Sequence, residues 1–132
     1  QVAREYSPVP TTMTDRHQVL QILVNLITNA KNAMVEHSGH TRRLTLRISV
    51  PSGRTFVRFE VVDTGVGIKP DNLPRLFAQG FTTRKDGHGL GLHSAALAAK
   101  NLGGTLQAQS MGEGYGATFT LDIPLVPVEA AA

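Results

Sequence analysis

The sequence of 132 residues contains no cysteine and no tryptophan, and its aromatic residues are five Phe and two Tyr. Without cysteine, disulfide frameworks, thiolate zinc sites and cysteine nucleophiles are excluded. No apolar run approaches the roughly 18 residues that a transmembrane helix requires. The first residues, Gln1-Val2-Ala3-Arg4, lack an apolar signal core, so we expect no export signal. The hydrophobic fraction of 41% is typical of one globular domain with a core.

The charge balance is nearly even, with a net charge of +3 that identifies no class of partner. Five arginines gather around one expected hairpin, without interleaved aromatic residues: Arg42, Arg43, Arg47, Arg54 and Arg58. Nucleic-acid binding surfaces usually combine such charges with aromatic residues, so we expect no nucleic-acid partner. The arginines are interpreted as the solvated face of a sheet or as a docking surface for neighbouring domains.

A long helix is predicted to begin after Asp15 and to end near Gly39. Asp15 is a suitable N-cap, and Gln18 three residues later is its capping-box partner. Apolar residues then recur at helical spacing, namely Leu20, Leu23, Val24, Ile27, Ala30 and Met34.

The remaining pattern predicts an α+β protein. Alternating apolar residues indicate one hairpin over residues 44–61 and another over residues 106–123. A short helix over about 71–77 and a small-residue helix over about 92–102 are expected between them. Together these elements predict a two-layer α/β sandwich, with helices on one face of a mixed, mostly antiparallel sheet.

The segments outside these elements are predicted as follows. Residues 1–14 are expected to be partly loop or edge strand, and residues 79–89 a loop. The domain is expected to span residues 1–124, with residues 125–132 as a tail or linker.

Three asparagines, Asn25, Asn29 and Asn32, share one face of the predicted long helix. Asparagine is a poor helix former because its amide competes for backbone hydrogen bonds, so helix propensity does not explain them. Amide oxygens suit hard cations such as Mg²⁺, and amide N–H groups can meet phosphate oxygens. The alternative is a solvated polar face flanked by Lys31 and Glu36.

Asp63 has the strand parity of Val57, Phe59 and Val61, so its carboxylate is expected on the apolar side of the sheet. A buried carboxylate needs a hydrogen-bond partner. The motif Asp63-Thr64-Gly65-Val66-Gly67-Ile68 follows the strand directly, and its glycines can open the backbone to a ligand. An exocyclic amino group such as that of adenine would satisfy Asp63. The alternative is a tight turn closed by an Asx-turn of Asp63.

The glycine-rich run Gly87-His88-Gly89-Leu90-Gly91-Leu92 leads directly into a predicted helix. Such a backbone at a helix N-terminus can bind an anion. The run fits neither the Walker P-loop nor the dinucleotide-binding fingerprint, because the residues that complete those motifs are missing. His88 either touches a phosphate or is simply solvated.

Phe77 and Phe81 border a segment that continues into Arg84 and Lys85. The two phenylalanines could anchor a loop whose charges meet a polyphosphate. The alternative is that both phenylalanines belong to the core and the charges are solvated.

The four motifs in their order along the chain resemble a known family. Residues 25–30 (Asn-Leu-Ile-Thr-Asn-Ala), 63–68, 76–83 (Leu-Phe…Gly-Phe-Thr-Thr) and 87–92 are similar to the asparagine, first glycine, phenylalanine and second glycine boxes of sensor histidine kinases. The resemblance covers about residues 5–124. The domain therefore looks like the ATP-binding catalytic module shared with DNA gyrase, heat-shock chaperone and mismatch-repair ATPases, the GHKL superfamily, whose α/β sandwich is the Bergerat fold.

The resemblance implies a role for each motif in binding ATP and Mg²⁺. Asp63 would accept from the adenine amino group, helped by a water near Thr118, while Gly65 and Gly67 would pass close to the base beside Ile68. Asn29 would be the main Mg²⁺ ligand, with Asn25 next to metal or phosphate.

The same likeness places the phosphates against the glycine-rich run. Backbone N–H groups of Gly87, His88, Gly89, Leu90, Gly91 and Leu92 would wrap them. Residues 77–86 would form a lid that includes Phe81, Thr82 and Thr83. Many family members carry Lys where Asn32 stands, so Arg84 or Lys85 is expected to supply that charge. The remaining glycines, such as Gly112, Gly114 and Gly116, are expected to be ordinary turn residues.

Asn25 bears on the type of reaction. Hydrolytic relatives carry a glutamate at its place to activate water, and an amide is not a base. The resemblance therefore implies phosphoryl transfer to a protein acceptor rather than ATP hydrolysis.

The acceptor itself is not evident. Sensor kinases phosphorylate a histidine that is followed by an acidic residue, and none of the five histidines here is. We expect a monomeric catalytic fragment whose acceptor lies on a separate dimerisation domain and whose pathway includes a response regulator receiver domain. We expect it to be cytoplasmic and without membrane contact of its own, whether or not the parent protein is membrane-anchored. Two alternatives stay open: a catalytically silent ATP-binding or interaction module, and an anti-sigma-type serine/threonine kinase.

Overall fold

The computed structural model describes residues 1–6, 15–37, 41–78 and 91–125. Its elements in chain order are β1 (Val2–Tyr6), α1 (Arg16–Glu36), β2 (Leu44–Ser49), β3 (Phe56–Asp63), the 3-10 helix η1 (Leu73–Arg75), α2 (Gly91–Asn101), β4 (Thr105–Gln109) and β5 (Ala117–Pro124). No helix within these ranges is long and apolar enough to cross a membrane.

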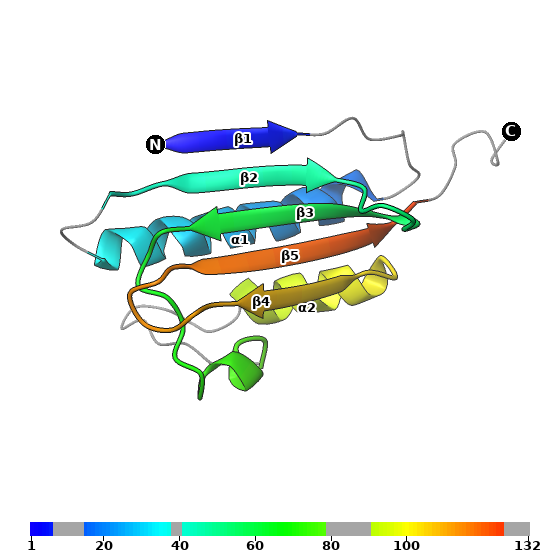
Figure 1. Ribbon diagram of the computed structural model, residues 1–132. Coiled ribbons are helices and arrows are strands. Elements are labelled where there is room, and N and C mark those ends of the chain that lie inside the picture. The colour runs from blue at the N-terminus through cyan, green and yellow to red at the C-terminus, as the bar shows by residue number, and fades with distance from the viewer. Residues whose placement is uncertain (7–14, 38–40, 79–90, 126–132) are drawn as a thin grey trace, which may run out of the picture.

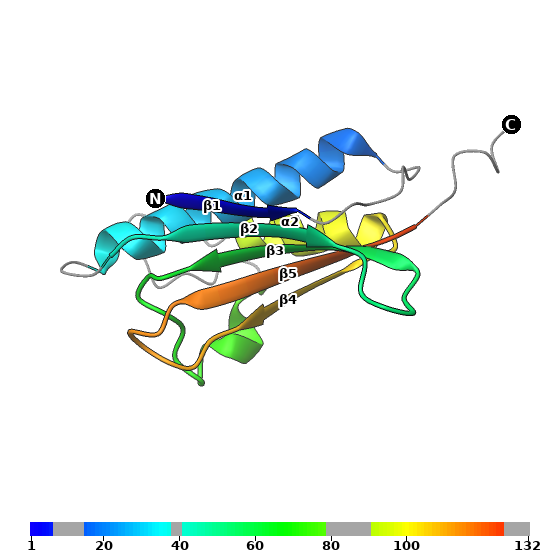
Figure 2. The same cartoon turned by 45° about the horizontal axis from the view of Figure 1, so that its top comes forward.

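The described strands form one sheet in the order β1-β2-β3-β5-β4 (Figure 1). Strand β1 runs parallel to β2, and the other neighbouring pairs are antiparallel. Figure 2 shows α1 and α2 on the same side of this sheet. The predicted two-layer α+β sandwich is therefore confirmed. Within residues 1–14, the predicted edge strand is β1, while residues 7–14 lie outside the described part of the chain.

Helix α1 begins where its capping residues predict. The Asp15 carboxylate accepts from the amides of His17 at 3.0 Å and Gln18 at 3.2 Å. The Gln18 side-chain amide donates to the second Asp15 oxygen at 3.1 Å. This contact replaces the second bond of a standard capping box, in which that side chain would accept from the backbone amide of the N-cap residue. The hydrogen bond from the Gln18 side chain is the largest cause that lowers the pKa of Asp15.

The buried stripe of α1 differs from the predicted one. Its buried residues are Ile22, Leu26, Ala30 and Met34. Leu20 is 50% exposed and Val24 is 60% exposed, so their assignment to the core stripe was wrong. Apolar residues occupy most of the circumference of this helix, so more than one stripe fits the helical period. The sheet selects the stripe that it covers, and Leu23 and Ile27 pack at its margin.

Helix α2 packs through small residues and ends at two glycines. Ala95, Ala98 and Ala99 are its buried residues. The Gly103 amide donates to the Lys100 carbonyl at 3.0 Å, and the Gly104 amide to the Ala99 carbonyl at 2.9 Å. This pair of bonds is the Schellman arrangement, which satisfies the last carbonyls of the helix.

One predicted element needs correction, and one further hydrogen bond lies just beyond the end of β5. The short helix expected over 71–77 is the single 3-10 turn η1. The Leu125 amide donates to the Thr55 carbonyl at 2.8 Å, so pairing between β5 and the start of β3 continues past residue 124. The loop predicted over 79–89 lies outside the described residues.

The face of the sheet opposite the helices carries two of the clustered arginines. Arg47 pairs with Glu5 at 2.6 Å, and Arg58 donates to both oxygens of Asp122 at 2.9 and 3.1 Å. The Arg58 guanidinium also lies 5.3 Å from the ring centre of Phe56, so an aromatic residue does accompany these arginines, contrary to the prediction. Two of the five arginines thus pair with carboxylates of neighbouring strands.

The corrected stripe of α1 predicts that two identical substitutions differ in cost. Leu26→Ala, at a fully buried position, should lower the free energy of unfolding by about 2–5 kcal/mol through lost burial and a cavity. Leu20→Ala, six residues earlier on the exposed side, should change it by about 0.5 kcal/mol or less. Urea denaturation measures both variants, and equal losses would show that the stripe is placed wrongly.

Candidate functional site

The last residue of β3, Asp63, is the most deeply buried acidic side chain that the described residues include, with 4% of its surface exposed. It pairs in register with Ala117 of β5 and lies on the helix side of the sheet. Its Oδ1 accepts from the Gly65 amide at 2.8 Å. Its Oδ2 is buried and has no hydrogen-bond partner among the described residues. The Asx-turn therefore accounts for Oδ1 of Asp63 but not for Oδ2, which could accept from a donor outside the described residues.

The electrostatics of Asp63 follow from this burial. Loss of contact with water raises the pKa of Asp63, while the amides of Gly65 and Ala117 act in the opposite direction. A buried carboxylate oxygen without a partner is costly, and a ligand N–H group placed against it would remove much of that cost. Asp63 is thus suited to accept from a neutral donor such as an amino group.

The loop that follows Asp63 is held on two sides by backbone hydrogen bonds. The Val66 amide donates to the Ala33 carbonyl of α1 at 3.1 Å. From the loop between β4 and β5, the Gly114 amide donates to the Val66 carbonyl at 2.7 Å and the Gly116 amide to the Gly65 carbonyl at 3.2 Å. These contacts fix the position of the carboxylate relative to both α1 and β5.

Ser110, which was not among the predicted site residues, supports the loop that follows Asp63. Its Oγ accepts from the Ile68 amide at 3.0 Å and from the Gly112 amide at 3.2 Å, and it donates to the Gly116 carbonyl at 2.6 Å. Ser110 therefore joins the end of the Asp63 loop to the turn that clamps it. The glycines of that turn are not ordinary turn residues alone, since their backbone groups hold the loop. Serine has no local sequence signal for this role, because its partner in the Asp63 loop, Ile68, lies 42 residues earlier in the chain.

Gly65 and Gly67 are required by the protein's own packing. A Cβ on Gly65 would lie 2.6 Å from the Ala33 carbonyl carbon. A Cβ on Gly67, whose φ is +76°, would lie 2.1 Å from the Gly112 carbonyl oxygen. These approaches explain both glycines without a ligand, so their predicted closeness to a base stays a prediction.

The three asparagines of α1 are half-buried, whereas the flanking Lys31 and Glu36 are exposed. Asn29 precedes Ala33 by four residues and therefore lies on the same face, one turn from the contact with Gly65. Within the described ranges no group of three His, Asp or Glu side chains could hold a metal ion. The side-chain amide oxygens of these asparagines are ligands of a kind that Mg²⁺ binds in proteins.

The structure does not bring Thr118 to Asp63, and its predicted role is corrected. In the β3–β5 register Thr118 pairs with Val62, while Ala117 pairs with Asp63. Successive strand residues point to opposite faces, so Thr118 lies on the face away from the carboxylate. The residue on the Asp63 side, Ala117, has no hydroxyl with which to hold a water.

The other predicted residues lie partly outside the described structure. Ile68 is half-buried after the Asp63 loop, Gly91 is the exposed first residue of α2, and Leu92 packs at the margin of the core. Phe77 packs edge-on against Phe119, with ring centres 6.3 Å apart. The residues outside the described ranges are Phe81, Thr82, Thr83, Arg84, Lys85, Gly87, His88, Gly89 and Leu90.

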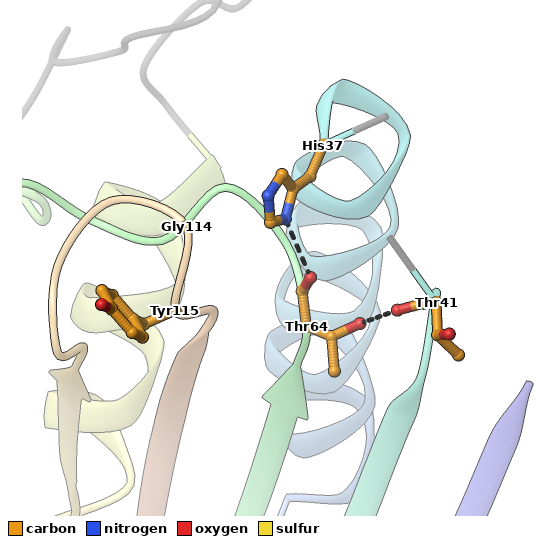
Figure 3. Close-up of a pocket in the computed structure, with 5 residues that line it drawn as sticks. All are labelled: His37, Thr41, Thr64, Gly114 and Tyr115. Atoms are coloured by element: carbon orange, nitrogen blue, oxygen red, sulfur yellow. Dashed lines mark hydrogen bonds between the residues drawn. The ribbon is translucent and has the colours of Figure 1, made fainter. Parts of the chain in front are cut away.

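A pocket of about 360 Å³ lies at the C-terminal end of α1 and is lined by His37, Thr41, Thr64, Gly114 and Tyr115 (Figure 3). His37 Nδ1 donates to the Thr64 carbonyl at 3.2 Å, and the Thr64 hydroxyl donates to the Thr41 carbonyl at 2.7 Å. None of these lining residues is a predicted ligand contact. The pocket is therefore separate from the candidate site around Asp63. The hydrogen bonds of its lining residues hold Thr64, the residue next to Asp63, in place.

Comparison with known proteins places these features in a family. A family model described as histidine kinase-, DNA gyrase B-, and HSP90-like ATPase matches residues 14–127. The chain is 38% identical over 112 residues to the sensor protein FixL of Bradyrhizobium diazoefficiens, a match that covers 85% of this chain and 21% of that protein. It is 34% identical over 117 residues to the sensor histidine kinase ZraS of Escherichia coli K12, covering 89% of this chain and 24% of the relative.

Solved structures agree with this assignment. Full-length ShkA, in complex with AMPPNP, superposes with a TM-score of 0.82 at 31% identity, over 97% of this chain and 26% of that one. The catalytic domain of the histidine kinase ThkA superposes with a TM-score of 0.77 at 26% identity, over 96% of this chain and 80% of that one.

The raised pKa of Asp63 predicts how Asp63→Asn changes stability with pH. The folded state keeps the Asp63 proton to higher pH than the unfolded state does. As pH rises above the ordinary Asp value of about 4, the unfolded chain ionises first, so this group lowers the stability of the wild-type protein until the folded-state pKa is passed. Asp63→Asn keeps an oxygen for the Gly65 amide and removes the ionisation. Its free energy of unfolding should therefore rise relative to wild type between acidic and neutral pH.

Urea denaturation at several pH values measures this difference. Asp15→Asn is the control, because the pKa of the exposed Asp15 is lowered rather than raised and asparagine caps a helix equally well. In that control the difference from wild type should not rise with pH. A flat difference for Asp63→Asn would contradict the buried, donor-poor environment described here.

Proposed function

The chain belongs to the histidine kinase-, DNA gyrase B- and HSP90-like ATPase family as a histidine kinase-type catalytic domain, and from this we propose that it binds ATP with Mg²⁺ and transfers the γ-phosphoryl group to a histidine on a separate dimerisation domain. The observation that carries the proposal is the buried, unpartnered Oδ2 of Asp63. The adenine amino group is a donor of the kind that this oxygen lacks.

Adenine recognition would depend on the clamped loop. The bonds from Ala33, Gly114 and Gly116 hold Asp63 in place before a ligand arrives, so little ordering is needed on binding. A nucleotide is supported independently by ShkA, whose solved structure is a complex with the ATP analogue AMPPNP.

The polyphosphate and its metal would lie between α1 and the start of α2. Asn29, with Asn25 beside it, offers amide oxygens to Mg²⁺, which would neutralise phosphate charge when bound. Asn32 extends the same face. At the other side, backbone N–H groups of Gly91 and Leu92 in the first turn of α2, together with the preceding glycine-rich run, would donate to phosphate oxygens.

The reaction is proposed to be transfer rather than hydrolysis. Asn25 is an amide and cannot take a proton from water, so the site offers no base at that position. The bond from the γ-phosphorus to its bridging oxygen would break with ADP as the leaving group, and a new bond would form to an imidazole nitrogen of the acceptor. The contribution of this domain is to position ATP for that displacement.

The partners follow from the relatives, of which this chain spans about a fifth to a quarter. Those relatives are named as sensor proteins and sensor histidine kinases. We propose a histidine-containing dimerisation domain as the phosphoryl acceptor and a response regulator receiver domain as the next carrier, with the site facing the cytoplasm.

Calorimetric titration with ATP, with and without Mg²⁺, tests the nucleotide site. Wild-type protein should bind ATP, and more tightly with Mg²⁺. Asp63→Asn should weaken binding at least about tenfold, because it loses a charged hydrogen bond and turns a donor toward a donor. Asn29→Ala should bind ATP with little remaining dependence on Mg²⁺.

The matched control is Asp71→Asn, the same substitution at an exposed acidic residue. Near wild-type affinity of Asp63→Asn would exclude Asp63 as the adenine acceptor. Unchanged Mg²⁺ dependence in Asn29→Ala would exclude that side chain as the ligand.

Phosphoryl transfer is tested by mixing the domain with γ-labelled ATP and the dimerisation domain of its parent protein. The expected product is an acid-labile phosphohistidine, because the phosphorus–nitrogen bond breaks in acid. An acid-stable phosphoester would instead indicate a serine/threonine kinase. Tight ATP binding without any transfer would indicate a binding module.

A further inference from the structure

His93, the third residue of α2, contacts a segment that lies sixteen residues earlier. Its Nδ1 is 3.0 Å from the main-chain carbonyl oxygen of Phe77, in a partly buried position. A carbonyl oxygen only accepts, so Nδ1 carries the hydrogen in this contact. The contact therefore persists whether the ring is neutral or protonated, since Nδ1 donates in both forms.

The two elements that His93 joins are each anchored in the core. Phe77 packs edge-on against Phe119, at an interplanar angle of 84°, and the neighbouring Leu76 is buried. Helix α2 is anchored on its other side by Ala95, Ala98 and Ala99. The bond from His93 thus ties the segment after η1 directly to the first turn of α2.

The first turn of α2 holds two of the proposed phosphate contacts. Gly91 and Leu92 directly precede His93, and amides in the first turn of a helix have no acceptor within the helix. The directions of these N–H groups therefore depend on how firmly the first turn of the helix is held. A side chain bonded to the neighbouring segment restrains that turn before phosphate arrives, which lowers the cost of ordering it on binding.

We infer that His93 is a positioning residue, which holds the first turn of α2 against the Phe77 carbonyl so that the amides of Gly91 and Leu92 are oriented toward the nucleotide phosphates. The inference rests on the proposed ATP site. It assigns to His93 no contact with the nucleotide, so its effect should appear in phosphate binding and not in adenine recognition.

Three substitutions at position 93 separate this role from general packing. His93→Asn keeps an amide donor at the same distance from Cβ as Nδ1, whereas His93→Gln moves its donor one bond farther and His93→Leu has none. ATP affinity in the presence of Mg²⁺ should fall roughly three- to tenfold in the Leu and Gln variants, the loss expected for one hydrogen bond. The Asn variant should stay within about twofold of wild type. Adenosine affinity, followed by chemical-shift titration, should be the same in all four proteins.

The outcomes are distinguishable. Absence of ATP binding by wild-type protein would overturn the proposed function and this inference with it. With wild-type binding intact, equal ATP affinity in the Leu variant, or equal losses for ATP and adenosine, would overturn the inference alone.

A spectroscopic readout tests the contact without any ligand. Nitrogen-15 spectra of the imidazoles should show His93 with its hydrogen on Nδ1, a signal assigned by its disappearance in His93→Asn. Hydrogen on Nε2 only would overturn the inference even if the Leu variant does not fold. Thermal melting of each variant confirms that the affinities compare folded proteins.

Discussion

A carboxylate held inside the protein with one oxygen unpaired is the constraint on which this structure depends. The Gly65 amide satisfies Oδ1 of Asp63, and no described group satisfies Oδ2. Such a group is unfavourable for the free protein and persists only where the surrounding contacts fix it. Here α1 contributes the Ala33 carbonyl, and the turn before β5 contributes the amides of Gly114 and Gly116. The contacts of the surrounding core thus keep Asp63 buried despite this cost, which a ligand donor of the proposed kind would offset.

The arrangement of layers explains why the site lies where it does. The helices cover one face of the sheet, so a residue with inward parity at the end of β3 is removed from water and lies close to the C-terminal end of α1. Asp63 has this position in β3, and the half-buried asparagines lie on the helix above the same face. On the opposite face, charged side chains form ion pairs with one another, as Arg58 does with Asp122 and Arg47 with Glu5. The two faces are therefore chemically distinct: among the described residues, the one buried side-chain oxygen without a partner, Oδ2 of Asp63, lies on the helix side.

Much of this arrangement could be predicted because it depends on local order in the chain. The capping of α1 at Asp15, the end of α2 at Gly103 and the inward parity of Asp63 each follow from residues within a few positions of one another. The apolar residues of α1 show where local information ends. Leu20 and Leu26 are the same residue type on one helix, and only the sheet's position makes one exposed and the other buried. Register is a second limit, since Thr118 and Ala117 are adjacent in sequence but occupy opposite faces.

The sequence by itself determined the fold class, the family and the placement of a carboxylate on the apolar side of a strand, because periodicity and motif order are properties of the chain alone. Only the tertiary structure decided which groups hold that carboxylate. Ser110, Gly114, Gly116 and Ala33 act on residues about thirty to fifty positions away, and His93 acts on Phe77 across a shorter gap. Hydrogen bonds between distant segments have no local signature, since any polar residue can make them once folding brings a partner within reach. The physical reason is that burial and pairing are decided together, by the packing of the whole domain.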